Sequence, residues 1–106
     1  MQGLVDVIAE YARAVESESV DNLKRVYPGM TAEQQKGWEQ FFGTVRDIKS
    51  QLNVQRADIS GDVSSVLVTG SYTYMNGSTR RTEQQQVSFR AIMRRSGGAW
   101  RMTEVH

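Results

Sequence analysis

The chain of 106 residues contains no cysteine, and its single histidine, His106, is the last residue. Without thiols it forms no disulfide, no thiolate metal site and no cysteine nucleophile. One histidine is too few for a multi-histidine metal site, and its terminal position argues against a histidine-based catalytic triad. The sequence therefore predicts no metal and no other cofactor.

Strong charge and long apolar runs are also absent. Lys and Arg number 13 against 12 Asp and Glu, so the net charge is +1, too small to favour nucleic acid as a partner. No apolar run approaches the ~20 residues of a membrane span, and the N-terminus lacks a signal-peptide pattern. We therefore expect a cytoplasmic protein that binds neither nucleic acid nor membranes. The remaining composition, 39% hydrophobic and 24% charged, is typical of one globular domain.

In the first half of the chain, apolar residues recur at spacings of three and four, which is typical of amphipathic helices. We expect helices over residues 2–16, 19–27 and 31–43. Ser19 is a candidate N-cap for the second helix, and Pro28 ends it because proline disfavours helix at the residue before it. Thr31 and Gln34 have the spacing of a capping box at the start of the third.

Beyond residue 45 the apolar pattern changes to a period of two, which indicates strands. We expect strands over residues 46–59, 63–75, 79–95 and 99–105. Asn76-Gly77 is a hairpin signal between the second and third. The parity of the apolar residues reverses between Val54 and Ala57, which predicts a bulge there. The fold class is thus α+β: three helices packed in a strongly curved, four-stranded antiparallel sheet.

Four stretches of the sequence resemble the nuclear-transport-factor-2-like superfamily. They are the helical residues 11–23, the segment from Tyr27 to Thr31, the strand start at 59–66 and the closing hairpin at 94–102. The resemblance implies the cone-shaped, cystatin-like fold that also houses ketosteroid isomerase and polyketide cyclases. The pattern is similar to a domain found C-terminal to bacterial signalling modules, which implies that this chain is part of a larger bacterial protein. It transfers no function, because this fold hosts enzymes, binders and assembly domains.

Strand parity predicts an aromatic concavity facing the helices. Its expected lining consists of Tyr11, Trp38, Phe41, Phe42, Val68, Tyr72, Tyr74, Gln85, Phe89, Met93, Trp100 and Met102. Aromatic rings with a few polar tips are the usual form of a small-molecule site. A packed core with tyrosine hydroxyls at its rim would have the same composition, and such cores are more common.

The same parity turns Glu83 and Glu104 toward the concavity. A carboxylate enclosed beside Tyr72 or Tyr74 could remove a proton next to a carbonyl group, while the phenol stabilises the enolate. The implied activity is that of a small lyase or isomerase acting on a cyclic carbonyl compound. The alternative, which we favour, is a rim carboxylate paired with one of the strand arginines.

The opposite parity forms an outer sheet surface that also contains apolar residues. This surface comprises Val63, Leu67, Arg90, Ile92, Arg101 and Val105. Apolar residues on both faces suggest that both are covered, and a second copy of the chain is the simplest cover. Isolated exposed aliphatics among polar residues would also explain the pattern. We therefore predict a non-catalytic domain that binds a small apolar ligand, forms a homodimer through the outer sheet, or both.

Overall fold

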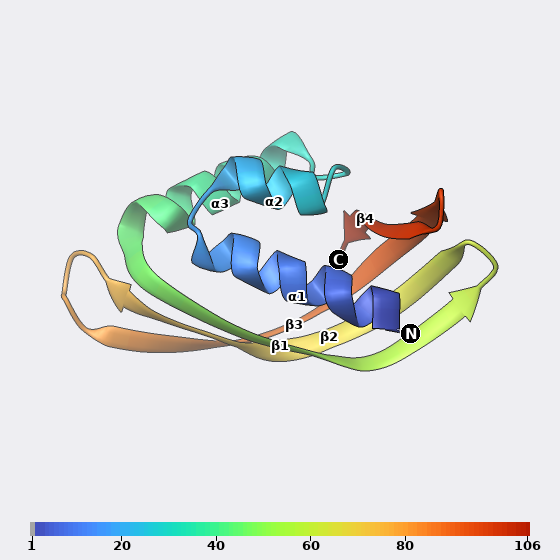
Figure 1. Cartoon of the computed structure of the whole chain (residues 1–106). Helices are drawn as coiled ribbons and strands as arrows, with labels where there is room; N and C mark the ends of the chain where they lie inside the picture. Colours follow the sequence, from blue (N-terminus) through green and yellow to red (C-terminus); the bar gives the residue numbers. More distant parts are fainter. Residues whose placement is uncertain (1) are drawn as a thin grey trace.

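Three helices precede four strands, and Figure 1 shows all three helices on the concave side of one curved sheet. The computed structural model describes residues 2–106. The elements are α1 (Gln2–Glu16), α2 (Val20–Val26), α3 (Ala32–Thr44), β1 (Val45–Ser60), β2 (Val63–Asn76), β3 (Thr82–Ser96) and β4 (Ala99–Val105). The sheet is antiparallel throughout, in the order β1-β2-β3-β4. The predicted α+β fold class is confirmed.

The helix starts follow the capping residues. The Ser19 side chain accepts a hydrogen bond from the Asn22 N–H at the start of α2. At the start of α3, the Thr31 hydroxyl accepts from the Gln34 N–H while the Gln34 amide oxygen accepts from the Thr31 N–H, so the capping box is complete. Such caps satisfy backbone donors that a helix start leaves free.

Two irregularities bend β1 around the helices. The pairing of β1 with β2 shifts by one residue between Val54 and Arg56, which confirms the predicted bulge. Because of it, Val54 pairs with Val68 and Ala57 with Val66, and both β1 residues turn toward the concave face. A second shift lies between Arg46 and Lys49.

The hairpin after β2 is longer than a two-residue turn. Strand β3 begins at Thr82, not at residue 79. The Asn76 side-chain oxygen accepts from the backbone N–H groups of Ser78 and Thr79, and Arg80 adopts φ +58°. Asn76 therefore stabilises this loop through its side chain, as asparagine commonly does in turns.

The core lies where α1 crosses the sheet. Leu4, Ile8 and Val15 present one face of α1, and each is at most 2% exposed. They pack against buried strand side chains that include Val66, Val68, Ala91, Met93 and Met102. Each such large side chain contributes about 1.5–3 kcal/mol by leaving water. None of the helices in residues 2–106 combines the length and apolar character needed to traverse a bilayer.

Strand β4 departs from the predicted alternation near its end. Met93 pairs with Met102 but Ile92 pairs with Glu104, so Thr103 is an extra residue. Its hydroxyl donates to the Ile92 carbonyl. Side chains reverse faces across such a bulge. The predicted orientations of the last residues are therefore wrong: Glu104 turns outward, and Val105 turns into the concave side.

Strand β4 is also much shorter than β3. Its residues pair with Ala91–Ser96, and His106 adds a pair with Arg90. The earlier part of β3, from Thr82 to Phe89, pairs only with β2. In Figure 1 this part of β3 extends well beyond the end of β4. One half of the sheet therefore lacks a fourth strand.

Candidate ligand pocket

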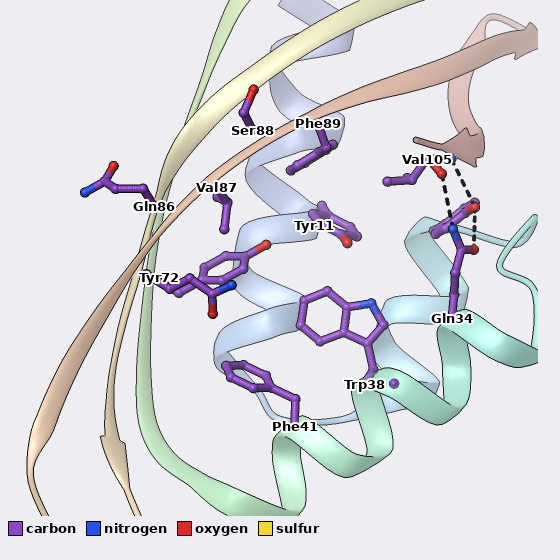
Figure 2. A pocket seen from close by; sticks show the side chains of 13 residues that line it. Tyr11, Gln34, Trp38, Phe41, Tyr72, Gln86, Val87, Ser88, Phe89 and Val105 are labelled. Atoms are coloured by element: carbon purple, nitrogen blue, oxygen red, sulfur yellow. Dashed lines mark hydrogen bonds between the residues drawn. The ribbon is translucent and has the colours of Figure 1, made fainter.

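A cavity of about 530 Å³ lies between α3 and this uncovered part of β3. Figure 2 shows its aromatic side chains converging from α1, α3 and the sheet. The predicted lining residues that do line it are Tyr11, Trp38, Phe41, Tyr72, Gln85 and Phe89. Its other lining residues are Tyr27, Gln34, Gly37, Gln86, Val87, Ser88 and Val105. A volume of several hundred Å³ is typical of small-molecule sites.

Trp38 is the centre of the aromatic wall. Its ring centroid lies 6.3 Å from that of Tyr11 and 6.2 Å from that of Tyr72, both in edge-to-face geometry. Phe41 lies 5.9 Å away on the next turn of α3. Phe89 contacts Tyr11 from the sheet at 5.8 Å. Each pair in such geometry contributes about 0.5–1.5 kcal/mol beyond burial, so the rings of the wall stabilise one another.

Two phenol groups supply polar atoms deep in the cavity. Burial raises the pKa of Tyr72 to about 12. Burial also raises the pKa of Tyr11 well above its ordinary value; the neighbouring Tyr72 and Tyr27 raise it further, and the Trp38 side chain offsets part of the shift. Both phenols are therefore neutral hydrogen-bond donors at physiological pH. Neither donates to another lining residue (Figure 2), so both hydroxyl groups can donate to a ligand.

A hydrogen-bonded clamp closes one end of the cavity. The Tyr27 hydroxyl donates to Gln34 Oε1 at 2.8 Å and accepts from the Val105 N–H at 3.1 Å. Gln34 Nε2 donates to the Val105 carbonyl at 3.2 Å. These bonds, drawn in Figure 2, join the end of β4 to the start of α3. The sequence predicts only a capping role for Gln34 and does not reveal its bonds to Tyr27 and Val105. A buried tyrosine hydroxyl needs a hydrogen-bond partner, so Tyr27 was the one indication of these bonds.

The other predicted lining residues lie outside this cavity. Val68, Met93 and Met102 are completely buried in the core. Phe42 stacks on Trp38 at 5.4 Å and Tyr74 contacts Phe41 at 5.2 Å, which places both behind the wall.

Trp100 lies beside the start of α1, outside the cavity. Its indole ring lies against Gly3, where an added Cβ would be 3.1 Å from Cδ1. The Arg95 guanidinium lies over the same ring at 4.9 Å. The expectation that Trp100 faces Tyr11 and Trp38 is therefore wrong, because α1 fills the intervening part of the cone.

Neither of the two predicted carboxylates is enclosed. Glu83 is exposed and accepts a hydrogen bond from Asn76 Nδ2. The Glu104 side chain is 59% exposed and its oxygen lies 3.8 Å from His106 Nε2. The hypothesis of a general base enclosed in the cone is therefore wrong for both residues. The favoured alternative holds only in part: both carboxylates are exposed, but within residues 2–106 neither forms an ion pair with an arginine. Within residues 2–106 no group of three or more His, Cys, Asp or Glu is placed to hold a metal ion.

The predicted outer surface is partly reproduced. Val63, Leu67 and Ile92 are half-buried on the convex side, and Arg90 and Arg101 are exposed. Val105 belongs to the pocket because of the bulge in β4. Figure 1 shows no helix on the convex side.

Comparisons with known proteins identify the architecture. No family model matches the sequence, and no curated protein matches it. Among solved structures, a candidate scytalone dehydratase from Novosphingobium aromaticivorans aligns with a TM-score of 0.83 at 12% identity, covering 99% of this chain and 80% of that one. A candidate dehydratase of the NTF2-like family from Streptomyces avermitilis aligns with a TM-score of 0.81 at 13% identity, covering 99% and 92%.

A ketosteroid isomerase-like protein from Erwinia carotovora atroseptica aligns with a TM-score of 0.73 at 17% identity, covering 94% of this chain and 88% of that one. The TM-scores establish the architecture, whereas identities this low leave the activity open. The resemblance predicted from the sequence is thereby confirmed at the level of the fold: the chain has the nuclear-transport-factor-2-like fold.

Proposed function

We propose that this domain binds a small, uncharged, mainly apolar molecule with a hydrogen-bond acceptor, and does not convert it. The observation that carries the proposal is the chemistry of the cavity wall. Aromatic rings surround it, and the polar groups of its lining side chains are neutral hydroxyls and amides. The lining residues within the described part of the chain include no carboxylate and no imidazole. Such a wall favours a ring system over an ion.

The two deep phenols define where the acceptor of the ligand would lie. Tyr11 and Tyr72 are neutral and have no acceptor among the other lining residues. A carbonyl oxygen that accepts from either hydroxyl gains about 0.5–1.5 kcal/mol over a hydrocarbon of the same shape. Trp38 and Phe89 then supply flat surfaces for the rest of the molecule.

A matched pair of probes tests this proposal. α-Tetralone and tetralin share a bicyclic skeleton, and only the former has a carbonyl group. We expect the wild-type protein to bind tetralone about fivefold more tightly, as one hydrogen bond implies, by titration followed with two-dimensional NMR. Tyr11→Phe or Tyr72→Phe should reduce this preference, while Tyr74→Phe, outside the cavity, should retain it. Equal binding of both probes by all four proteins would contradict the proposal.

The enzymatic alternative rests on the named neighbours, which include candidate dehydratases and an isomerase-like protein. A lyase or isomerase acting on a cyclic carbonyl compound would remove a proton beside the carbonyl group. Tetralone in D₂O reports such a step directly, because the α-protons exchange with solvent deuterium. Exchange faster than in buffer, lost on Tyr11→Phe, would favour the enzyme over the binding domain.

We also propose that a second copy covers the convex face of the sheet. Supporting this proposal, Leu67 and Ile92 lie there beside Val63 on strands that no helix covers. A stable dimer needs about 800 Å² from each partner. Sedimentation equilibrium should show a dimer that Leu67→Glu dissociates. Gln40→Glu, at an exposed position of α3 on the other side of the sheet, should preserve it. A wild-type monomer at high concentration would overturn this proposal.

The proposal extends to the biological setting. We propose a cytoplasmic location and, from the sequence resemblance, a place within a larger bacterial protein. The bacterial sources of the similar solved structures support a bacterial origin.

A further inference from the structure

The uncovered edge of β3 lies directly beside the cavity. From Thr82 to Ser88, β3 has β2 on one side and, among residues 2–106, no strand on the other. All of these residues except the half-buried Val87 are exposed. An edge of this length is normally protected by proline, a bulge or a covering element, and the registers show no bulge in this part of β3.

The direction of the free backbone groups follows from the last pair of the β3–β4 ladder. Arg90 donates its N–H to the His106 carbonyl at 3.0 Å and accepts from the His106 N–H at 2.8 Å. Successive residues of an antiparallel strand direct their backbone groups to opposite sides, so every second residue directs them to the same side. Gln84, Gln86 and Ser88 therefore direct theirs toward the same side as Arg90. These groups continue the ladder beyond His106 without a partner in the described chain.

Successive side chains of β3 point to opposite faces of the sheet, and the odd-numbered ones point toward the cavity. Gln85, Val87 and Phe89 line the cavity from β3. An added strand would place its own alternate side chains beside theirs, over the mouth of the cavity. Across that mouth, α3 presents Gly37, where an added Cβ would have no neighbour within 4 Å. The structure thus provides open space for the side chains of an added strand.

We propose that this edge binds an extended peptide segment of another protein, antiparallel to β3, with apolar side chains at alternate positions entering the cavity. Main-chain bonds to Gln84, Gln86 and Ser88 give affinity in this mode, and the pocket selects the apolar side chain. The segment between residues 80 and 90 contains three arginines and one glutamate, Glu83. The peptide is therefore neutral or acidic at its ends.

A second copy is a poorer occupant of the same edge. Two-fold pairing that uses the whole free span, Thr82 with Ser88, centres on Gln85. It brings the hairpin loop of each copy, which contains Arg80 and Arg81, close to Arg90 of the other copy, so like charges gather at both ends of the pairing. It also places Glu83 opposite Val87 on the cavity side, so a carboxylate meets the apolar mouth. An apolar peptide avoids both conflicts.

A synthetic heptapeptide tests the proposal. Its order is aspartate, valine, threonine, phenylalanine, threonine, valine, aspartate, with acetylated and amidated ends. In the proposed register the phenylalanine enters the cavity, and the threonine amides face β3. We expect saturable shifts of the Gln84, Gln86 and Ser88 amide signals and slower hydrogen exchange at these amides.

N-methylation gives a matched pair of control peptides. Methyl groups on both threonine nitrogens remove donors of the new ladder and should weaken binding at least tenfold. Methyl groups on both valine nitrogens face away from β3 and should change the affinity less than threefold. Equal affinity of the two methylated peptides, or no binding of the parent peptide at millimolar concentration, would overturn the proposal.

Two variants of the protein test the hydrogen bond that the Gln86 N–H donates to the peptide. Gln86→Pro removes an N–H that β2 does not use, a substitution that edge strands tolerate, and should weaken peptide binding about tenfold. Gln86→Ala keeps the N–H and should stay within twofold of wild type. If Gln86→Pro does not fold, the methylated peptides on wild-type protein decide. A wild-type dimer that Gln86→Pro converts to a monomer would assign the edge to a second copy and overturn the proposal.

Peptide binding at the β3 edge goes beyond the proposed binding of a small molecule, and separate measurements test the two. Tetralone needs the cavity but no backbone N–H of β3. Gln84→Pro removes another outward N–H of the edge at a position that does not line the cavity. This variant should therefore bind tetralone as wild type does and bind the peptide more weakly. The peptide needs both the cavity and the edge, and tetralone should compete with it for the cavity. Loss of peptide binding with tetralone binding retained therefore speaks for the edge alone.

Discussion

The cone has two halves that differ in how they are filled. In the closed half, β4 pairs with Ala91–Ser96 and α1 covers the sheet. There Leu4, Met93 and Met102 are completely buried. In the open half, α3 faces the part of β3 from Thr82 to Phe89, β4 is absent, and a cavity of about 530 Å³ remains.

The shortness of β4 explains this difference. A packed core forms in the half of the sheet that β4 joins, and a cavity remains in the other half. α3 has no buried residue even though it carries three aromatic rings toward the sheet. Its rings pack on one another and on Tyr11 and Tyr72, and not on a fourth strand. In the open half, aromatic rings that contact one another thus border a cavity instead of a packed core.

Truncation of a side chain should lower the free energy of unfolding much more in the closed half than in the open half, and this is the largest difference we expect. Met93→Ala removes a completely buried side chain and should lower the free energy of unfolding by about 2–5 kcal/mol. Phe89→Ala removes a larger side chain that already borders the cavity, so we expect a loss of only about 1–2 kcal/mol. Urea unfolding of both variants measures the contrast. Equal losses would show that the open half is packed as tightly as the closed one.

The sequence predicts the closed half well because period and parity control it. The spacing of Leu4, Ile8 and Val15 predicts the buried face of α1, and the parity reversal at Val54 predicts the β1 bulge. These signals are local, and burial of one strand face enforces them along the whole strand.

Strand β4 and the cavity beside its end were less predictable because their features depend on long-range geometry. A single extra residue, Thr103, exchanges the faces of Glu104 and Val105, and no apolar repeat in so short a strand marks it. The clamp between Tyr27, Gln34 and Val105 joins residues more than 70 positions apart. Strand parity placed Trp100 in the cavity because it describes a face and not a position along the cone.

Alkaline pH should weaken the protein through the cavity phenols. Burial raises the pKa of Tyr72 to about 12, whereas an unfolded tyrosine has a pKa near 10. Between pH 10 and 12 the unfolded phenol ionises and the folded one does not, so stability is lost as pH rises. The loss should be on the order of 2 kcal/mol by pH 12.

Tyr72→Phe should show a shallower decline in the free energy of urea unfolding from pH 9 to 11.5. Tyr74→Phe, which retains both cavity phenols, is the control and should decline as wild type does. The same steep decline in all three proteins would mean that burial of Tyr72 does not cause it.

The clamp determines whether the end of β4 stays attached beside the open half. Gln34→Ala removes the side-chain half of the capping box, the acceptor of the Tyr27 hydroxyl and the bond to the Val105 carbonyl. It should cost about 1–2 kcal/mol. Gln34→Glu keeps the acceptor for Thr31 and Tyr27 but loses the donor to Val105, so its cost should be about half as large. Amide exchange at Val105 should accelerate in both variants. Unchanged exchange would show that pairing with β3 alone holds the strand end.

Gly37 offers the smallest effect and the sharpest test of why the open half is open. Gly37 and Gly43 lie in the same helix, and an added Cβ has no neighbour within 4 Å at either position. Alanine should therefore stabilise α3 by about 0.5–1 kcal/mol at both. Leucine should separate them, because only Gly37 lines the cavity. Gly37→Leu should lose tetralone and peptide binding at unchanged or higher stability, while Gly43→Leu keeps both. If Gly37→Leu binds as wild type does, the mouth of the cavity lies elsewhere, and the contrast between the two halves reflects packing without function.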